Sequence, residues 1–145
     1  MYYLGVTGTQ EGLTPAQMVR VETLLSDLRS VEFSVMHNGK CIGADYSLAC
    51  IWDKLGGKLW WHPPTITTKM VNLILTGENS DSPLPYLDRN RVIVDRSRVL
   101  IACPKEFKEQ LRSGTWATIR YARKSKKAHV IVWPDGTVQK ESYNV

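Results

Sequence analysis

The fold is indicated most clearly by one stretch, Val99-Leu100-Ile101-Ala102 followed by Arg112-Ser113-Gly114-Thr115-Trp116-Ala117-Thr118. The first run is apolar and typical of a buried strand, and the second begins a helix. A helix N-terminus has unpaired N–H groups and about half a positive charge. Gly114 lets a ligand come close to the backbone, while Ser113, Thr115 and Thr118 offer hydroxyls. The stretch therefore predicts a phosphate-binding turn, although a simple capped helix would have a similar sequence.

Apolar runs and amphipathic helical patterns alternate along the whole chain. Strands are expected at 2–6, 33–37, 58–62, 99–102 and 129–133, and helices begin at Pro15, Ala44, Asp88 and Gly114. Thr14 and Gln17 have the spacing of a capping box. We also expect a short helix around 70–75 and a short edge strand at the C-terminal end. The alternation predicts an α/β, Rossmann-like fold whose mostly parallel sheet of about five strands carries helices on both faces.

Length and composition are those of a globular protein. The 145 residues fit a single domain, residues 1–145, and 43% of them are hydrophobic. No apolar run approaches the roughly 20 residues of a membrane span, and the first residues do not have the pattern of a signal peptide. Three scattered cysteines favour reduced thiols over a disulfide framework. We expect a cytoplasmic protein with no membrane partner.

Charge is unevenly distributed. Residues 88–127 contain 12 Lys and Arg against four Asp and Glu, a local net charge of +8, so the remainder carries −3 of the total +5. A basic segment on a neutral-to-acidic scaffold favours an anionic partner, although a solvated basic helix face would give the same pattern.

Ligands of parallel α/β sheets bind outside the carboxyl ends of the strands. This rule selects the loops after Val6, His37, His62 and Ala102. Polar and small residues in these loops are the candidate ligand-binding residues: Gly8, Thr9, Gln10, Gly43, Asp45, Arg89, Asn90, Ser113, Gly114, Thr115 and Thr118. Asp45 would hold a ribose hydroxyl or simply cap its helix, and an Arg89 fork matches phosphate geometry. Trp116 is a candidate for base stacking.

Metal binding is not expected. His37 and Cys41 are four residues apart, but no second pair of ligands accompanies them. His62 follows two tryptophans and is expected to close a buried strand. We therefore expect neither a metal nor a cofactor.

Taken together, these loops resemble the SLOG superfamily of Smf/DprA-type and LOG-type Rossmann-like proteins, in particular its small stand-alone YspA-like members from bacteria and phages. The matching segments cover nearly the whole chain in order: 5–9, 41–45, 62–64, 86–90 and 112–118. The resemblance implies nucleotide-type ligands at the strand ends and assembly into homo-oligomers.

Within that resemblance, the turn at 113–118 differs from LOG-type enzymes. Those enzymes have a Gly-Gly-x-Gly-Thr-x-x-Glu motif whose glutamate takes part in cleaving a base from a nucleotide. Alignment on Gly114 and Thr115 puts Thr118 where that glutamate would lie. The Ser-Gly-Thr-x-x-Thr form is closer to the DprA-type turn, which favours binding over cleavage.

Three hypotheses follow. The first is a protein that binds, and thereby senses or sequesters, a nucleotide or a nucleotide-derived signal, cyclic ones included. The second is a nucleotide or nucleoside N-glycosidase or transferase, with Asp45 or Glu11 as the catalytic carboxylate. The third is DprA-like binding of single-stranded nucleic acid through Lys124, Lys126 and Lys127.

Overall fold

The computed structural model describes residues 2–71 and 79–143. Its strands are β1 (Tyr2–Gly8), β2 (Phe33–Asn38), β3 (Lys58–Trp61), β4 (Asn79–Ser80), β5 (Val99–Cys103), β6 (His129–Val132) and β7 (Val138–Glu141). Its helices are α1 (Pro15–Ser30), α2 (Ala44–Lys54), α3 (Tyr86–Arg96) and α4 (Gly114–Lys124). These elements confirm the α/β, Rossmann-like prediction.

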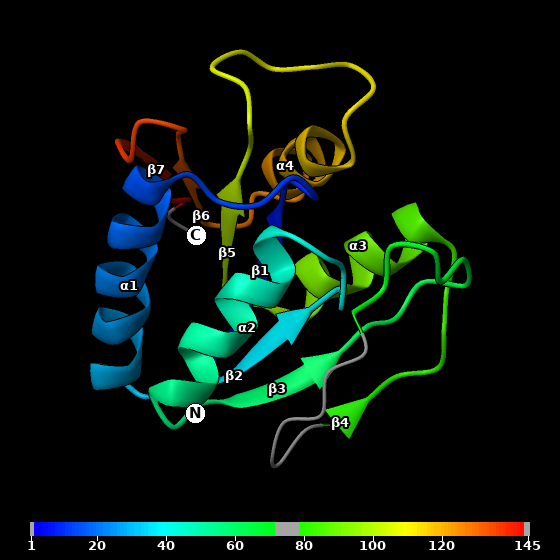
Figure 1. Ribbon diagram of the computed structural model, residues 1–145, viewed down its shortest axis with the longest axis horizontal. Coiled ribbons are helices and arrows are strands. Elements are labelled where there is room, and N and C mark those ends of the chain that lie inside the picture. The colour runs from blue at the N-terminus through cyan, green and yellow to red at the C-terminus, as the bar shows by residue number, and fades with distance from the viewer. Residues whose placement is uncertain (1, 72–78, 144–145) are drawn as a thin grey trace.

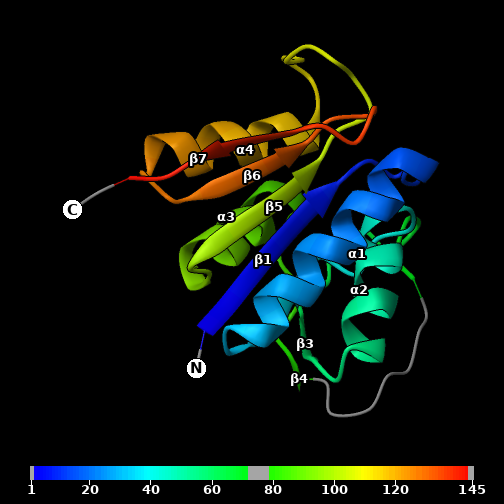
Figure 2. The ribbon, with the colours of Figure 1, turned by 90° about the vertical axis from the view of Figure 1, so that its left-hand side faces the viewer.

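The strands form one sheet in the order β4-β3-β2-β1-β5-β6-β7, in which only β7 pairs antiparallel. Helices α1 and α2 cover one face of the sheet, and α3 and α4 cover the other (Figures 1 and 2). The chain changes face at the pair β1–β5, where Leu4 lies opposite Val99 and Gly8 opposite Cys103. Strand order reverses at this pair, so the loops after β1 and β5 diverge and leave a crevice between them.

The sheet has seven strands, more than the expected five, because both edges are extended. The short strand expected near the C-terminus is β7. The two-residue β4 is an edge strand that its sequence, Asn79-Ser80, does not suggest. The helix expected around 70–75 falls mostly on residues outside the described part of the chain, and Met70 forms an antiparallel bridge with Cys41.

Local sequence signals explain the element boundaries. The Thr14 side chain accepts a hydrogen bond from the Gln17 N–H, and the Gln17 side chain accepts one from the Thr14 N–H, which confirms the capping box. Helix α3 begins at Tyr86, two residues earlier than expected, because Pro85 occupies its N-cap position.

Close packing of α3 on the sheet depends on Gly5. A Cβ at this position would lie 2.4 Å from Ser97 Oγ and 2.8 Å from Ile93 Cγ2. Any residue larger than glycine at position 5 would therefore push α3 away from the sheet, and Tyr86 would move with the helix. The main core lies on the opposite face, where Leu4, Met36 and Trp52 are buried.

Candidate functional site

A cleft of about 810 Å³ opens at the β1–β5 crevice. Three parts of the chain surround it: the loop after β1, the long loop between β5 and α4 together with the first turn of α4, and Tyr86 at the start of α3. The lining residues are Gly8, Thr9, Gln10, Glu11, Tyr86, Lys105, Glu106, Glu109, Gln110, Leu111, Arg112, Ser113, Gly114 and Thr115. Its volume is within the range of about 300–1,000 Å³ that is common for small-molecule sites.

The first turn of α4 faces this cleft with free donors. Ser113 caps the helix, and its Oγ accepts a hydrogen bond from the Trp116 N–H at 3.2 Å. The N–H groups of Gly114 and Thr115 have no acceptor among the described residues. The Thr115 hydroxyl also has no partner there, although the residue is only 7% exposed. A donor cluster of this kind is suited to an anion.

The loop after β1 forms the opposite wall of the cleft. A Cβ at Gly8 would lie 2.4 Å from the Ala44 Cβ, so only glycine lets β1 approach α2 this closely. Thr9 is buried, and its hydroxyl accepts a hydrogen bond from the Glu11 N–H at 3.1 Å. Glu11 is on the rim and pairs with Lys105 at 3.1 Å.

Gly43 and Asp45 lie behind this wall and do not line the cleft. Gly43 has a φ of 84°, and a Cβ there would come within 2.5 Å of the carbonyl oxygens of Thr9 and Gln10. Asp45 is buried, and its carboxylate accepts a hydrogen bond from the Cys41 N–H at 3.3 Å. Burial raises the pKa of Asp45 to about 6, against the opposing effects of the Arg89 charge and the Cys41 N–H. Both residues stabilise the loops around the cleft.

Arg89 is buried below the cleft, and its guanidinium is used inside the protein. Its Nη1 donates to the carbonyl oxygens of Gly39 and His62, the latter at 3.0 Å. The group also lies 4.6 Å from the centre of the Tyr86 ring. These contacts hold two loops against α3, the helix that carries Arg89.

Three more expected ligand residues lie outside the main cleft. Asn90 and Thr118 line a separate groove of about 330 Å³ between α3 and α4. The Thr118 hydroxyl donates to the Gly114 carbonyl at 2.8 Å, which satisfies it within the helix. Trp116, the residue expected to stack on a base, is 1% exposed and packs on Trp133 inside the protein.

Tyr86 is part of the matching segment 86–90 and Arg112 of the segment 112–118, but neither of them, nor any of residues 105–111, is among the candidate ligand residues expected from the sequence. Tyr86 lines the cleft because α3 packs tightly over Gly5. The signal for residues 105–111 is their position between a strand and the start of a helix, where a long loop is often functional. Figure 1 shows this β5–α4 connection projecting beyond the end of the sheet.

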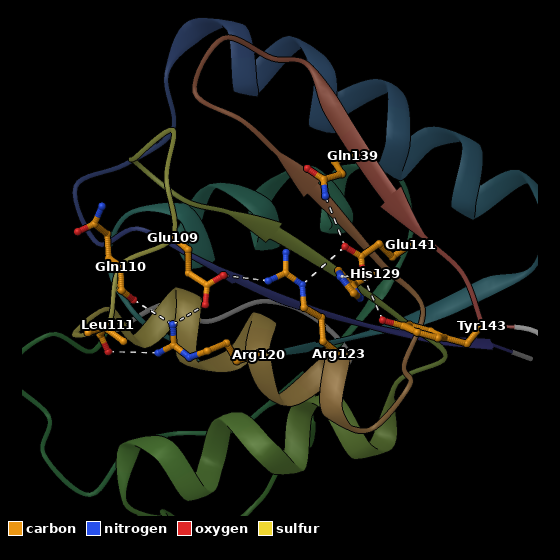
Figure 3. Close-up of polar contacts among 9 residues, drawn as sticks. All are labelled: Glu109, Gln110, Leu111, Arg120, Arg123, His129, Gln139, Glu141 and Tyr143. Carbon is orange, nitrogen blue, oxygen red and sulfur yellow. Dashed lines mark hydrogen bonds and ion pairs between the residues drawn. The ribbon is translucent and has the colours of Figure 1, made fainter.

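Ion pairs on α4 hold the β5–α4 loop in place (Figure 3). Glu109 accepts hydrogen bonds from Arg120 and Arg123, each at 3.0 Å. Arg123 also lies 3.6 Å from Glu141 on β7, and Glu141 lies 3.3 Å from the His129 ring. The two arginine hydrogen bonds lower the pKa of Glu109. The loop that forms one cleft wall is therefore joined to α4 and the sheet edge.

His37 and His62 form a buried pair outside the cleft. The His37 Nδ1 and the His62 Nε2 are 2.8 Å apart, and the His62 Nδ1 lies 3.5 Å from the Asp81 carboxylate. Burial lowers the pKa of both rings to about 4, although the Asp81 charge acts in the opposite direction on each. Both rings are therefore neutral at pH 7. Among the described residues, no group of three or more His, Cys, Asp and Glu could hold a metal ion.

The fold and cleft define a Rossmann-like α/β protein with a candidate ligand site at the point where the sheet changes face. Solved structures of the same fold include DNA processing protein A from Helicobacter pylori (TM-score 0.65, 20% identity, 90% of this chain and 64% of that chain). A second is a molybdenum cofactor binding protein from Rippkaea orientalis (TM-score 0.64, 22% identity, 91% and 76%). A third is DprA from Streptococcus pneumoniae (TM-score 0.67, 21% identity, 90% and 50%).

These neighbours are 20–22% identical to this chain, and the likeness shows that they share its fold. The chain spans less than two thirds of the DprA chains that it matches. No family model and no curated protein matches it. Within the described residues, no helix is long and apolar enough to cross a membrane.

We predict that both His37 and His62 titrate near pH 4 in the folded protein, because burial disfavours the charged rings. The same residues in the urea-unfolded chain should titrate near pH ~6.5. Imidazole proton signals followed by NMR measure both midpoints. Since the unfolded chain takes up protons first, the stability contributed by this pair is complete above pH ~6.5 and is lost as the pH falls towards 4.

The variant Asp81→Asn serves as an internal check. The Asp81 charge raises the pKa of His62, so its removal should move the His62 midpoint still lower. A midpoint of either ring near its unfolded value in the folded wild type would contradict this description of the pair.

Proposed function

We propose that the protein binds a nucleotide or a nucleotide-derived ligand in the β1–β5 cleft and does so without cleaving it. The ligand phosphate accepts hydrogen bonds from the N–H groups of Gly114 and Thr115 and from the hydroxyl of Thr115. Gly8, Thr9 and Gln10 form the facing wall. The observation that carries the proposal is the set of unpartnered donors on the first turn of α4, which open into an 810 Å³ cleft.

The cleft is lined by three carboxylates and two cations, and one of these cations, Arg112, supports an anionic ligand. Arg112 lines the cleft, is exposed, and has no ion-pair partner among the described residues. It takes the role that the sequence alone assigns to Arg89. Binding of a molybdenum cofactor by the Rippkaea protein is a further support, because it is a small-molecule use of the same fold.

Cleavage is less well supported than binding. Hydrolysis at a sugar carbon requires a carboxylate close to the ring. Asp45 does not line the cleft, and Glu11 is 70% exposed and paired with Lys105 on the rim. Thr118 faces a different groove. The homo-oligomer expected from the resemblance stays a prediction.

We predict that nucleotides at about 100 times their dissociation constant stabilise the protein by about 2.7 kcal/mol. For a chain of this size, that stabilisation raises the melting temperature by roughly 5–10 °C. Thr115→Val removes the free hydroxyl and keeps the side-chain shape, so it should weaken binding about tenfold. The control is Thr23→Val, on the exposed face of α1, which should bind as the wild type does. Differential scanning fluorimetry measures all three proteins.

The proposal fails if no nucleoside mono-, di- or triphosphate or cyclic nucleotide raises the melting temperature. Chromatography of the incubated nucleotide detects any free base that is released. Such a release would support the N-glycosidase alternative over binding without cleavage.

A second candidate function is binding of single-stranded nucleic acid. The groove between α3 and α4 carries Arg91, Arg120 and Lys124, and it lies in the basic part of the chain. The Helicobacter pylori neighbour is described as binding single-stranded DNA. Lys127 is excluded from this role because its amine donates to the Ser97 carbonyl and so joins α4 to α3.

This candidate predicts oligonucleotide affinity that falls steeply with salt, because released counterions drive the binding. The double variant Arg91→Ala/Lys124→Ala should weaken binding and reduce the salt slope by roughly one for each phosphate that is no longer neutralised. Fluorescence anisotropy of a labelled oligonucleotide at several salt concentrations measures the slope. Binding that is unchanged in the variant would mean that these cations form only a solvated helix face.

A further inference from the structure

A second, smaller cavity of about 300 Å³ adjoins the main cleft. The two share Gln10 and Tyr86 as lining residues. The far wall of this side pocket comes from Cys41, just after β2, and from the segment 64–69, just after β3. A ligand that extends beyond Tyr86 from the main cleft therefore enters the side pocket.

Tyr86 separates the two cavities and is held in place on several sides. Gln10 lines both cavities beside it. The Arg89 guanidinium lies 4.6 Å from the ring centre. A Cβ at Gly114 would lie 2.6 Å from the Tyr86 Cε1, so the ring lies directly beside the free donors of α4. The position of the ring fixes the distance between a phosphate on α4 and the mouth of the side pocket.

The groups inside the side pocket are uncharged at neutral pH. Burial raises the pKa of the Cys41 thiol and also the pKa of the Tyr86 phenol. Pro64, Pro85 and Ile66 contribute apolar surface, and the hydroxyls of Thr65 and Thr68 can bond a ring edge. Among the described residues that line it, Lys69 carries the only charge, and its side chain is exposed.

We infer that the ligand has two nucleotide parts: one with its phosphate on the first turn of α4 and its base in the main cleft, and a second whose uncharged, planar base lies in the side pocket. The ligand chemistry is thus a dinucleotide step, supplied by a free dinucleotide or by a nucleic-acid strand. This inference rests on the proposed function. It adds that a mononucleotide fills only part of the site, since the side pocket is large enough for one ring system.

Isothermal titration calorimetry with 5′-AMP and with the 5′-phosphorylated diadenylate pApA tests the inference. We expect the wild type to bind pApA at least about tenfold more tightly, equivalent to about 1.4 kcal/mol. Thr68→Trp fills the side pocket and should remove this gain while leaving 5′-AMP affinity unchanged. The matched control is Thr67→Trp, an exposed neighbour that does not line the pocket, and it should behave as the wild type does.

The outcomes separate the two proposals. Equal affinity for 5′-AMP and pApA, or a pApA gain that survives in Thr68→Trp, overturns the two-part ligand and leaves the proposed function intact. Binding of neither ligand overturns both. A third titration, with octa-adenylate, distinguishes the two kinds of ligand. Affinity higher than that for pApA indicates a nucleic-acid strand, and equal affinity indicates a free dinucleotide.

Discussion

The parallel pairing of β1 with β5 is the constraint on which the candidate site depends. At this pair of strands the chain moves from one face of the sheet to the other. The helices that follow β1 and β5 therefore lie on opposite faces. The loops that follow the two strands must diverge, and their divergence leaves the cleft. The same pairing brings Gly8, at the end of β1, beside Cys103, at the end of β5. The first turn of α4 then lies across the cleft from the β1 loop.

Cations near this cleft serve two different purposes. Arg89 is buried and donates to carbonyl oxygens of the surrounding loops, which positions Tyr86. Arg120 and Arg123 hold Glu109 and hence the β5–α4 loop. Of these three arginines, Arg89 is the one that the sequence alone assigns to a ligand. The groups at the cleft without such contacts are the N-terminal N–H groups of α4, the Thr115 hydroxyl and the exposed Arg112, and we propose that the backbone donors carry most of the anion recognition.

The sequence was sufficient for the strand–helix order and for the start of helix α4, because both depend on local patterns such as the Thr14 capping box and the Ser113-Gly114-Thr115 run. It could not separate residues that are close in sequence but face different cavities. Thr118 lies one turn after Gly114, yet its hydroxyl returns to the helix backbone and its side chain borders another groove. Tyr86 belongs to the matching segment 86–90, but its place in the cleft could not be predicted because it depends on packing between α3 and Gly5, which are distant in sequence.

The first turn of α4 is the element that we propose to hold the ligand phosphate. Backbone amide chemical shifts followed by ¹⁵N NMR during addition of 5′-AMP test this most directly, since a hydrogen bond to a phosphate changes the shift of the donating N–H. We predict the largest changes at Gly114 and Thr115, with smaller ones at Gly8 and Gln10. Largest changes in the α3–α4 groove, at Thr118 and Lys124, or no change at Gly114 and Thr115 at saturation, would contradict it.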